Sequence, residues 1–102
     1  MRKLNLLDYE IQTPNGTRNY QVKDSIIMLL FNPELKLDAV MLLKTNELAL
    51  KISSAKDEIL LEEAEYNLIS NSINKFKGYV QNDVELVERT LNAEQVDVME
   101  VK

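Results

Sequence analysis

Residues 9–22 read YEIQTPNGTRNYQV, and this stretch decides how the fold begins. Apolar and polar residues alternate on both sides of a central turn, which is the period-2 pattern of half-buried strands. Pro14 fixes φ near the value needed at the second position of a type I turn. Asn15 tolerates the third position, and Gly16 can take the positive φ of a bulge after such a turn. The stretch therefore predicts a β-hairpin.

The hairpin needs support, because a two-stranded hairpin alone is only marginally stable in water. The residues before it are also apolar, but they change phase. Leu4 and Leu6 lie on the other phase of the alternation from Leu7, so we expect a bulge between the last two. The rest of the chain must then supply the apolar surface on which the hairpin lies.

Two helices are predicted after the hairpin. Residues 25–31, SIIMLLF, indicate a short buried helix with Asp24 as its N-cap. Pro33 stops it, since the residue before a proline avoids the helical region. A second helix begins after Asp38 as a cap and ends near residues 53–54. Its expected core stripe is Leu37, Val40, Met41, Leu48 and Ile52.

Residues 57–77 predict a third helix, whose start is ambiguous. Its apolar face is expected to be Tyr66, Ile69, Ile73 and Phe76. Glutamates occupy its first turn and lysines its last turn, where the helix dipole favours each, and Gly78 suits the C′ position. Residues 58–61 fit either a short strand or a backward extension of this helix, and we favour a short break between them.

A last helix and an alternating tail complete the chain. Asn82 and Glu85 have the spacing of a capping box, with Asn82 as the N-cap. The apolar face of this helix is expected to be Val84, Val87 and Leu91. The tail residues Val96, Val98 and Val101 alternate in part, so the tail either adds an edge strand to the hairpin or stays loose. The prediction is a single α+β domain, residues 1–102, with an N-terminal β-hairpin packed on three to four short helices.

The residue types that are missing limit the chemistry. The 102 residues include no cysteine, no histidine and only two glycines. Common zinc, haem and transition-metal sites, thiol chemistry and phosphate-cradling loops are therefore excluded. The densest carboxylate cluster, residues 57–65, matches no calcium loop, and a solvated helix start explains it better. We expect no enzyme activity, no cofactor and no bound metal.

The charge and the hydropathy of the chain limit the kinds of partner that it can bind. The net charge is −5, and residues 55–102 carry eleven acidic and five basic residues. This half repels phosphate backbones but suits a basic protein partner, so we expect no nucleic-acid binding. The longest apolar run, Ile26–Phe31, is far shorter than a membrane span, and the N-terminus has no export signal. We expect a cytoplasmic protein with no membrane contact.

Residues 26–31 and 41–43 contain more apolar side chains than one small helix normally buries on one face. Either these segments are buried all round by their own domain, or they form a surface for a protein partner or a homo-oligomer. The candidate partner-binding residues are Ile27, Leu30, Phe31, Met41, Leu42 and Leu43. A small-ligand pocket lined by the four tyrosines (Tyr9, Tyr20, Tyr66 and Tyr79) is the alternative.

Three segments carry a resemblance to a known group of proteins. They are QVKDSIIMLLFNPELKL (21–37), EILLEEAEYNLISNSI (58–73) and NDVELVERTLNAEQV (82–96). With the preceding hairpin, their order resembles small hypothetical proteins encoded by bacteriophages and prophages. The shared pattern within the second segment is carried by Ile59, Leu61, Glu65, Tyr66 and Ile69. These are packing and capping motifs, so the resemblance implies a general layout and a bacterial host, with no catalytic residue.

The resemblance and the composition lead to one functional expectation and two alternatives. We expect a non-enzymatic protein-interaction or assembly accessory protein of phage origin, for example one like a tail-assembly chaperone. One alternative is an inhibitor of a host or defence protein that acts through the acidic residues 57–65 and 83–100. The other is the small-ligand-binding protein described above.

Overall fold

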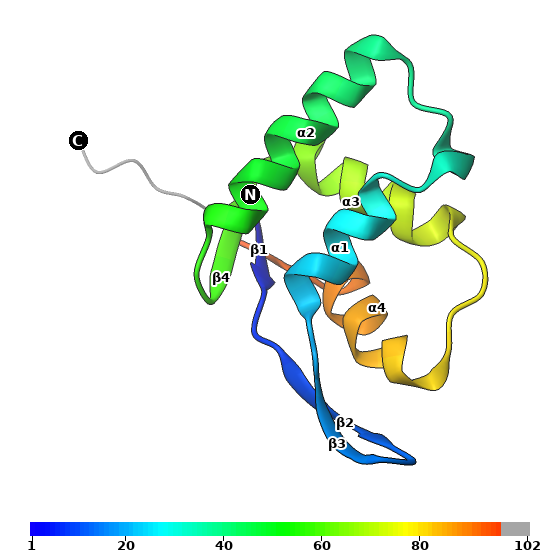
Figure 1. Ribbon diagram of the computed structural model, residues 1–102. Coiled ribbons are helices and arrows are strands. Elements are labelled where there is room, and N and C mark those ends of the chain that lie inside the picture. The colour runs from blue at the N-terminus through cyan, green and yellow to red at the C-terminus, as the bar shows by residue number, and fades with distance from the viewer. Residues whose placement is uncertain (97–102) are drawn as a thin grey trace.

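The computed structural model describes residues 1–96, which form an α+β fold of two small sheets and four α-helices (Figure 1). The strands are β1 (Arg2–Asn5), β2 (Tyr9–Thr13), β3 (Gly16–Tyr20), β4 (Glu58–Leu61) and β5 (Glu94–Gln95). The helices are α1 (Val22–Leu30), α2 (Ala39–Ser54), α3 (Glu63–Lys75) and α4 (Val84–Leu91). Two short 3₁₀ helices are η1 (Pro33–Leu35) and η2 (Gln81–Asp83). The predicted α+β class and the N-terminal hairpin are confirmed.

The hairpin of β2 and β3 forms where the alternating pattern places it. The two strands pair antiparallel, from Tyr9 opposite Tyr20 to Thr13 opposite Gly16. Gly16 has a φ of +114°, as a bulge after a type I turn requires. The Thr13 hydroxyl donates to the Gly16 carbonyl at 2.6 Å and ties the two ends of the turn together. The hairpin projects from the body, with its tip away from the helices (Figure 1).

The second sheet has the strand order β4-β1-β5, and both of its pairings are antiparallel. The predicted bulge between Leu6 and Leu7 is wrong, because β1 ends at Asn5 and pairs with β4 and β5 instead of extending the hairpin. Asn5 Oδ1 accepts a 2.8 Å hydrogen bond from Leu7 N where the chain leaves the sheet. The two apolar phases thus belong to two separate sheets.

This sheet also settles the two segments that the sequence left open. Residues 58–61 form strand β4 rather than an extension of α3, because they pair along the whole of β1. Near the C-terminus, β5 lies just before the alternating tail and pairs with β1 rather than with the hairpin, with Arg2 opposite Gln95. Val98 and Val101, the other members of that alternation, lie outside the described residues.

The helices are capped both by adjacent residues and by residues distant in the sequence. α2 is capped as predicted, with Asp38 Oδ1 accepting from Met41 N at 2.8 Å, and it ends at Ser54. α1 begins earlier than expected, at Val22, so Asp24 lies inside its first turn and is not its N-cap. The carboxylate that accepts from Val22 N is Asp8, fourteen residues upstream, at 2.9 Å. A cap supplied by a distant residue leaves no local spacing to recognise.

Two further capping predictions are wrong. α3 ends with Phe76 as its C-cap, which places Lys77 at C′ and Gly78, with a φ of +109°, one residue later. α4 is preceded by η2, so its N-cap is Asp83 rather than Asn82. The 3₁₀ helix includes Asn82, so this residue cannot act as the N-cap of α4.

The buried face of α4 differs from the predicted one. Leu86 and Thr90 are buried, whereas Val84 and Leu91 are exposed. The Thr90 hydroxyl donates to the Leu86 carbonyl at 2.9 Å, four residues back, so its polar atom is satisfied within the helix. Thr90 therefore packs as an apolar residue, which a count of apolar letters does not register.

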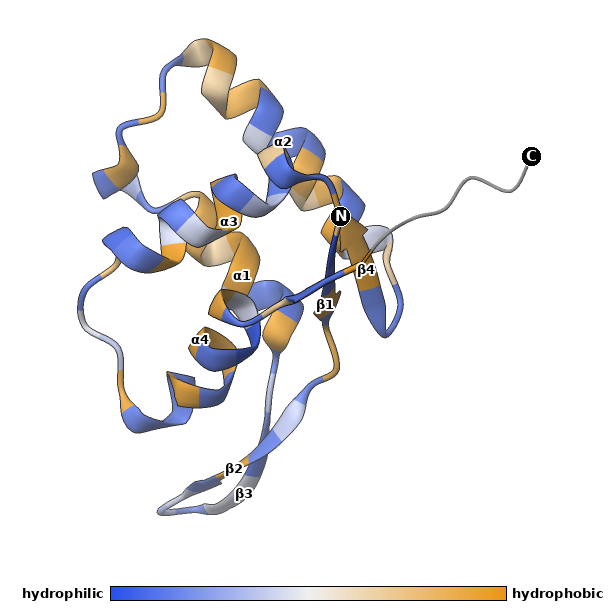
Figure 2. Cartoon of the chain, turned by 180° about the vertical axis from the view of Figure 1, so that it is seen from behind, coloured by the Kyte–Doolittle hydropathy of each residue, from blue (hydrophilic) through white to orange (hydrophobic). Residues whose placement is uncertain are grey.

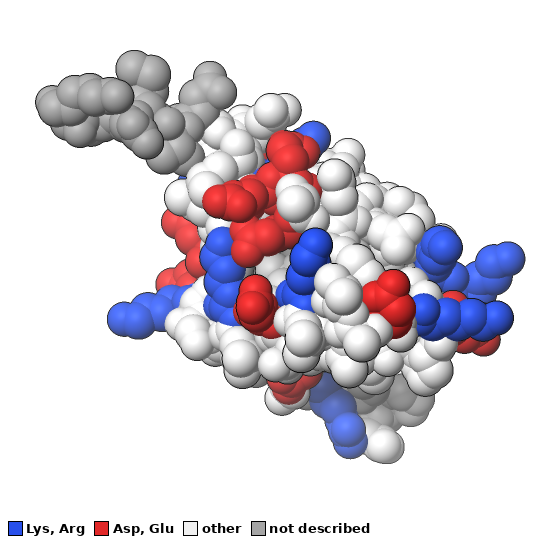
Figure 3. Space-filling model, turned by 90° about the horizontal axis from the view of Figure 1, so that it is seen from above, with Lys and Arg blue, Asp and Glu red and all other residues white. Residues whose placement is uncertain are grey.

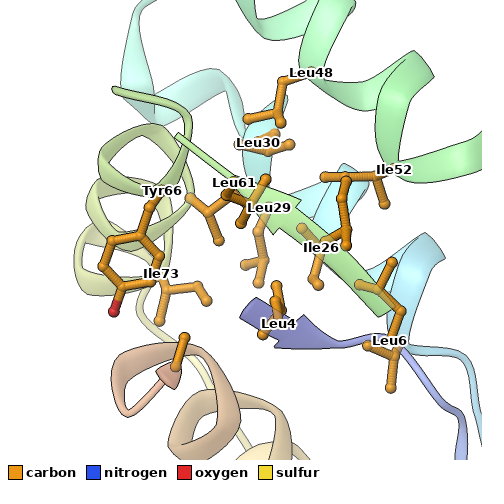
Figure 4. Close-up of a cluster of buried hydrophobic side chains, with 14 of the residues drawn as sticks. Leu4, Leu6, Ile26, Leu29, Leu30, Leu48, Ile52, Leu61, Tyr66 and Ile73 are labelled. Carbon is orange, nitrogen blue, oxygen red and sulfur yellow. The ribbon is translucent and has the colours of Figure 1, made fainter. Parts of the chain in front are cut away.

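One hydrophobic core joins both ends of the chain. Figure 4 shows side chains from β1, β4 and the first three helices pointing toward one another. The apolar core residues with under 2% exposure are Leu4, Leu6, Val22, Ile26, Leu30, Ile52, Leu61, Ile69 and Leu86. The Tyr66 hydroxyl donates to the Thr90 carbonyl at 2.7 Å. Within residues 1–96, no buried side-chain nitrogen or oxygen lacks a hydrogen-bond partner.

Candidate interaction surface

Helix α2 is apolar on two opposite sides. One side packs into the core through Thr45, Leu48, Ala49 and Ile52. The opposite side carries Val40, Leu43 and Leu50, which are 62%, 65% and 60% exposed. At about 100° per residue, these three lie within roughly one quadrant of the helix, facing away from the core. We call them the outer face of α2.

The rest of the molecule holds α2 mainly by its second half. Leu48 and Ile52 anchor it in the core, and Lys51 Nζ forms a 2.8 Å ion pair with Glu65 on α3. The first half projects from the body, and Figure 2 shows that this projecting end is mostly hydrophobic. Two charged residues belong to the same side of the helix: Glu47 lies within this quadrant, between Leu43 and Val40 around the helix axis, and Lys44 lies beside it. Neither forms an ion pair within residues 1–96.

The structure separates the six predicted partner-binding residues into three places. Leu30 is 1% exposed, so it belongs to the core and cannot contact a partner in the folded chain. Ile27 and Phe31 are partly buried on α1, and Met41 is partly buried on α2. Only Leu42 and Leu43 are exposed large apolar side chains of the predicted set.

The sequence analysis missed part of the outer face. The prediction that Val40 belongs to the core stripe is wrong, since its side chain is 62% exposed. Leu50 is not among the six predicted partner-binding residues. The helical spacing of Val40, Leu43 and Leu50, at i, i+3 and i+10, was the available signal, and it falls on the side opposite Leu48 and Ile52.

Ile27 and Phe31 contribute instead to a shallow apolar groove of about 410 Å³ between α1 and the end of α3. Its other lining residues are Met28, Leu29, Asn32, Pro33 and Phe76. Phe76 is held in place by an edge-to-face contact with Tyr79, with ring centroids 4.8 Å apart. Of its lining residues, Leu29 belongs to the buried core, and the groove lies on a different helix from the outer face.

The four tyrosines do not converge on one ligand pocket. Tyr66 lies in the core with its hydroxyl on the Thr90 carbonyl. Tyr9 and Tyr20 stack with centroids 4.6 Å apart, and their hydroxyls donate to the Asn82 carbonyl and to Asp83 Oδ1. The Tyr79 hydroxyl donates to the Ile73 carbonyl at 2.7 Å. These hydroxyls are therefore used to hold the chain together.

Burial and Asp83 perturb three of the tyrosines. Burial raises the pKa of Tyr20, and the hydrogen bond to Asp83 raises it further, because a phenolate could not donate and would face a carboxylate. Burial also raises the pKa values of Tyr9 and Tyr79, with Asp83 adding a smaller contribution to both. All three phenols are thus neutral at physiological pH.

The acidic residues 57–65 are largely paired. Lys3 pairs with Glu58 at 3.1 Å, Arg2 pairs with Glu63 at 3.3 Å, and Lys51 pairs with Glu65. Figure 3 shows acidic and basic side chains intermingled on the face seen from above. Within residues 1–96, no group of three or more acidic side chains is arranged to hold a metal ion. This segment therefore offers a basic partner less uncompensated charge than the sequence indicates.

Comparison of the chain with protein-family models, with curated proteins and with solved structures gave no match. No helix within residues 1–96 has the length and hydropathy needed to span a bilayer.

Proposed function

We propose that the protein is a non-enzymatic assembly accessory that associates with a second copy of itself through the outer face of α2. The observation that carries this proposal is the pair of opposite apolar sides on α2. A helix that is hydrophobic on both sides is normally covered on both. The chain covers one side with its own core and leaves Val40, Leu43 and Leu50 to solvent.

The residues along α2 favour a second copy as the occupant, because the outer face is self-complementary. Two α2 helices packed antiparallel around a two-fold axis between Asn46 and Glu47 place Leu43 opposite Leu50 of the second copy. Leu50 then meets Leu43 of the second copy by symmetry. The same apolar contact is thus made twice.

The charges within and beside this face also match across the two-fold axis. In the same register Lys44 lies about 3 Å along the axis from Glu47 of the second copy, within reach of its carboxylate. The symmetry forms this ion pair twice. Neither residue forms an ion pair within residues 1–96 of its own chain. An unrelated helix would not supply this reciprocal arrangement.

The biological setting is a further part of the proposal. The resemblance of the strand, turn and helix order to small phage-encoded proteins supports a role in virion assembly inside a bacterial host. A protein that self-associates through an apolar helix face suits such a role, because the face is covered in the dimer and becomes free to shield apolar segments of larger chains when the dimer dissociates.

Light scattering over a hundredfold range of concentration tests the association. We expect a mass of two chains, and we expect Leu43→Glu to give the mass of one chain. Val80→Glu is the matched control, since Val80 is 63% exposed but lies outside α2, and this variant should stay dimeric. Circular dichroism should show both variants folded. A wild-type mass of one chain at every concentration would overturn the proposal.

Charge exchange distinguishes a second copy from any other partner. Lys44→Glu and Glu47→Lys should each weaken the dimer by about tenfold, because each replaces two ion pairs with two repulsions. The double variant restores the pairs across the two-fold axis and should recover most of the affinity. If the double variant is as weak as the single variants, the antiparallel register is wrong.

A further inference from the structure

Strand β2 has an unpaired edge that forms one wall of a groove. Within the described residues, β2 pairs only with β3. Its other edge faces η2 and α4 across a groove of about 570 Å³, within the range of peptide and ligand sites. The groove is lined by Tyr9, Glu10, Ile11 and Gln12 of β2 and by Gln81, Asn82, Val84, Glu85 and Glu88 opposite.

Tyr9 fixes the width of this groove at its inner end. Its hydroxyl donates to the Asn82 carbonyl at 2.7 Å and accepts from Leu86 N at 3.3 Å. These two bonds tie β2 to η2 and α4. Beyond Tyr9, the groove is lined on this side by the next three residues of β2, residues 10–12. The two walls are therefore preorganised, and little ordering cost remains for a bound segment.

The charge of the groove selects its occupant. Three glutamates line it: Glu10, Glu85 and Glu88. Arg89 pairs with Glu85 at 2.5 Å, and its guanidinium is also held by the Leu7 carbonyl. Glu10 and Glu88 form no ion pair within residues 1–96. Arg18 stands opposite Ile11 on β3 but does not line the groove. A basic segment is favoured here.

A shallow apolar depression lies next to the acidic groove. A depression of about 240 Å³ is formed by Tyr79, Val80, Asp83, Val84, Val87 and Glu88. It shares Val84 and Glu88 with the groove. An extended chain alternates its side chains, so it can place a lysine toward Glu88 and an aliphatic residue over the valines. This combination suits a strand with alternating basic and aliphatic residues.

We propose that the β2 edge accepts an extended basic segment of another protein as an added strand. Backbone hydrogen bonds to β2 supply the pairing, as in other cases of strand addition, and Glu10 and Glu88 select for basic residues. This site lies on the hairpin and α4, so it does not depend on the association through α2.

The test uses the full chain and a fluorescein-labelled ten-residue peptide in which lysine alternates with threonine and valine. Fluorescence anisotropy should show saturable binding that weakens as salt rises from 50 to 500 mM. A peptide with glutamate in place of lysine should not bind. A lysine peptide N-methylated at two consecutive central residues keeps its charge but cannot pair as a strand on either edge, so it should bind at least tenfold more weakly.

Protein variants locate the site. Glu10→Gln with Glu88→Gln should weaken peptide binding about tenfold. Glu34→Gln, an exposed glutamate on η1 outside the groove, should change it less than twofold. Three results would each overturn the proposal: no saturable binding at 1 mM peptide, equal binding of the N-methylated peptide, or unchanged binding by the double variant. The second of these would leave only nonspecific charge attraction.

Discussion

The Tyr20 hydroxyl donates a 2.6 Å hydrogen bond to Asp83 Oδ1, across 63 residues of sequence. The other oxygen of that carboxylate accepts from Val80 N at 2.9 Å. One side chain thus fixes the turn before α4 and the end of the hairpin at the same time. The stacking of Tyr20 on Tyr9 extends the connection to β2, so the hairpin is held on the helices by a short polar chain.

Removing this bond should destabilise the protein without unfolding it. We expect Tyr20→Phe to lower the free energy of unfolding by about 1.5–3 kcal/mol, since hydrogen bonds to charged groups contribute roughly that much. Asp83→Asn should cost a similar amount, and urea unfolding measures both. Asn19→Ala, an exposed change on the same strand, should have little effect. A Tyr20→Phe variant as stable as the wild type would show that the bond contributes nothing net.

The same tyrosines predict how stability depends on pH. The pKa values of Tyr9, Tyr20 and Tyr79 are raised above the ordinary value of 10.0, first by burial. The unfolded chain therefore releases these protons at a lower pH than the folded chain does. Their contribution is fully present below about pH 10 and is lost progressively as the pH rises above it.

Urea unfolding at pH 8 to 11 checks this direction. Lysines also titrate in this window, so the informative quantity is the difference between wild type and variant. The loss of stability above pH 10 should be shallower in Tyr20→Phe than in the wild type. An identical slope in both would contradict the raised pKa of Tyr20.

Truncation of one buried and one exposed leucine should have very different effects on stability. Leu30→Ala should lower the free energy of unfolding by about 2–5 kcal/mol, because it leaves a cavity among fully buried side chains. Leu43→Ala should change it by less than about 0.5 kcal/mol, since that side chain is mostly solvated in the monomer. Both are measured by urea unfolding at a concentration too low for association. Comparable losses in the two variants would mean that α2 is not arranged as described.

Local patterns predicted much of this fold. The hairpin follows from an alternating pattern and from one glycine that must take positive φ. The limits of α2 follow from the Asp38 cap and from Ser53–Ser54. In each case the deciding atoms lie within a few residues of one another, so the sequence displays them together.

Long-range contacts account for most of the errors. Strand β1 leaves the hairpin because Arg2–Asn5 pair with residues almost sixty positions later. The N-terminus of α1 is capped by Asp8, fourteen residues upstream. Thr90 is a local exception, because a hydrogen bond within its own helix satisfies its hydroxyl and allows its burial. Leu30 was wrongly predicted as a partner-binding residue for a related reason. Leu30 and Leu43 are the same residue type, and only packing decides that one is core and the other is exposed.

Arg89 provides the last prediction, because it joins the connection between the two sheets to α4. Its guanidinium donates to the Leu7 carbonyl at 2.5 Å and to Glu85 Oε2 at 2.5 Å, and it lies 5.1 Å from the centroid of the Tyr9 ring. Only a planar fork can make these contacts together. Arg89→Lys keeps the charge but loses some of these contacts. We therefore expect it to lower the free energy of unfolding by about 1–3 kcal/mol and to speed amide exchange at residues 6–8.

Glu85→Gln is the control, because it removes only the exposed partner, and it should lower the free energy of unfolding by under about 1 kcal/mol. If Arg89→Lys costs no more than Glu85→Gln, the ion pair alone explains the role of Arg89 and the contact to Leu7 is unimportant.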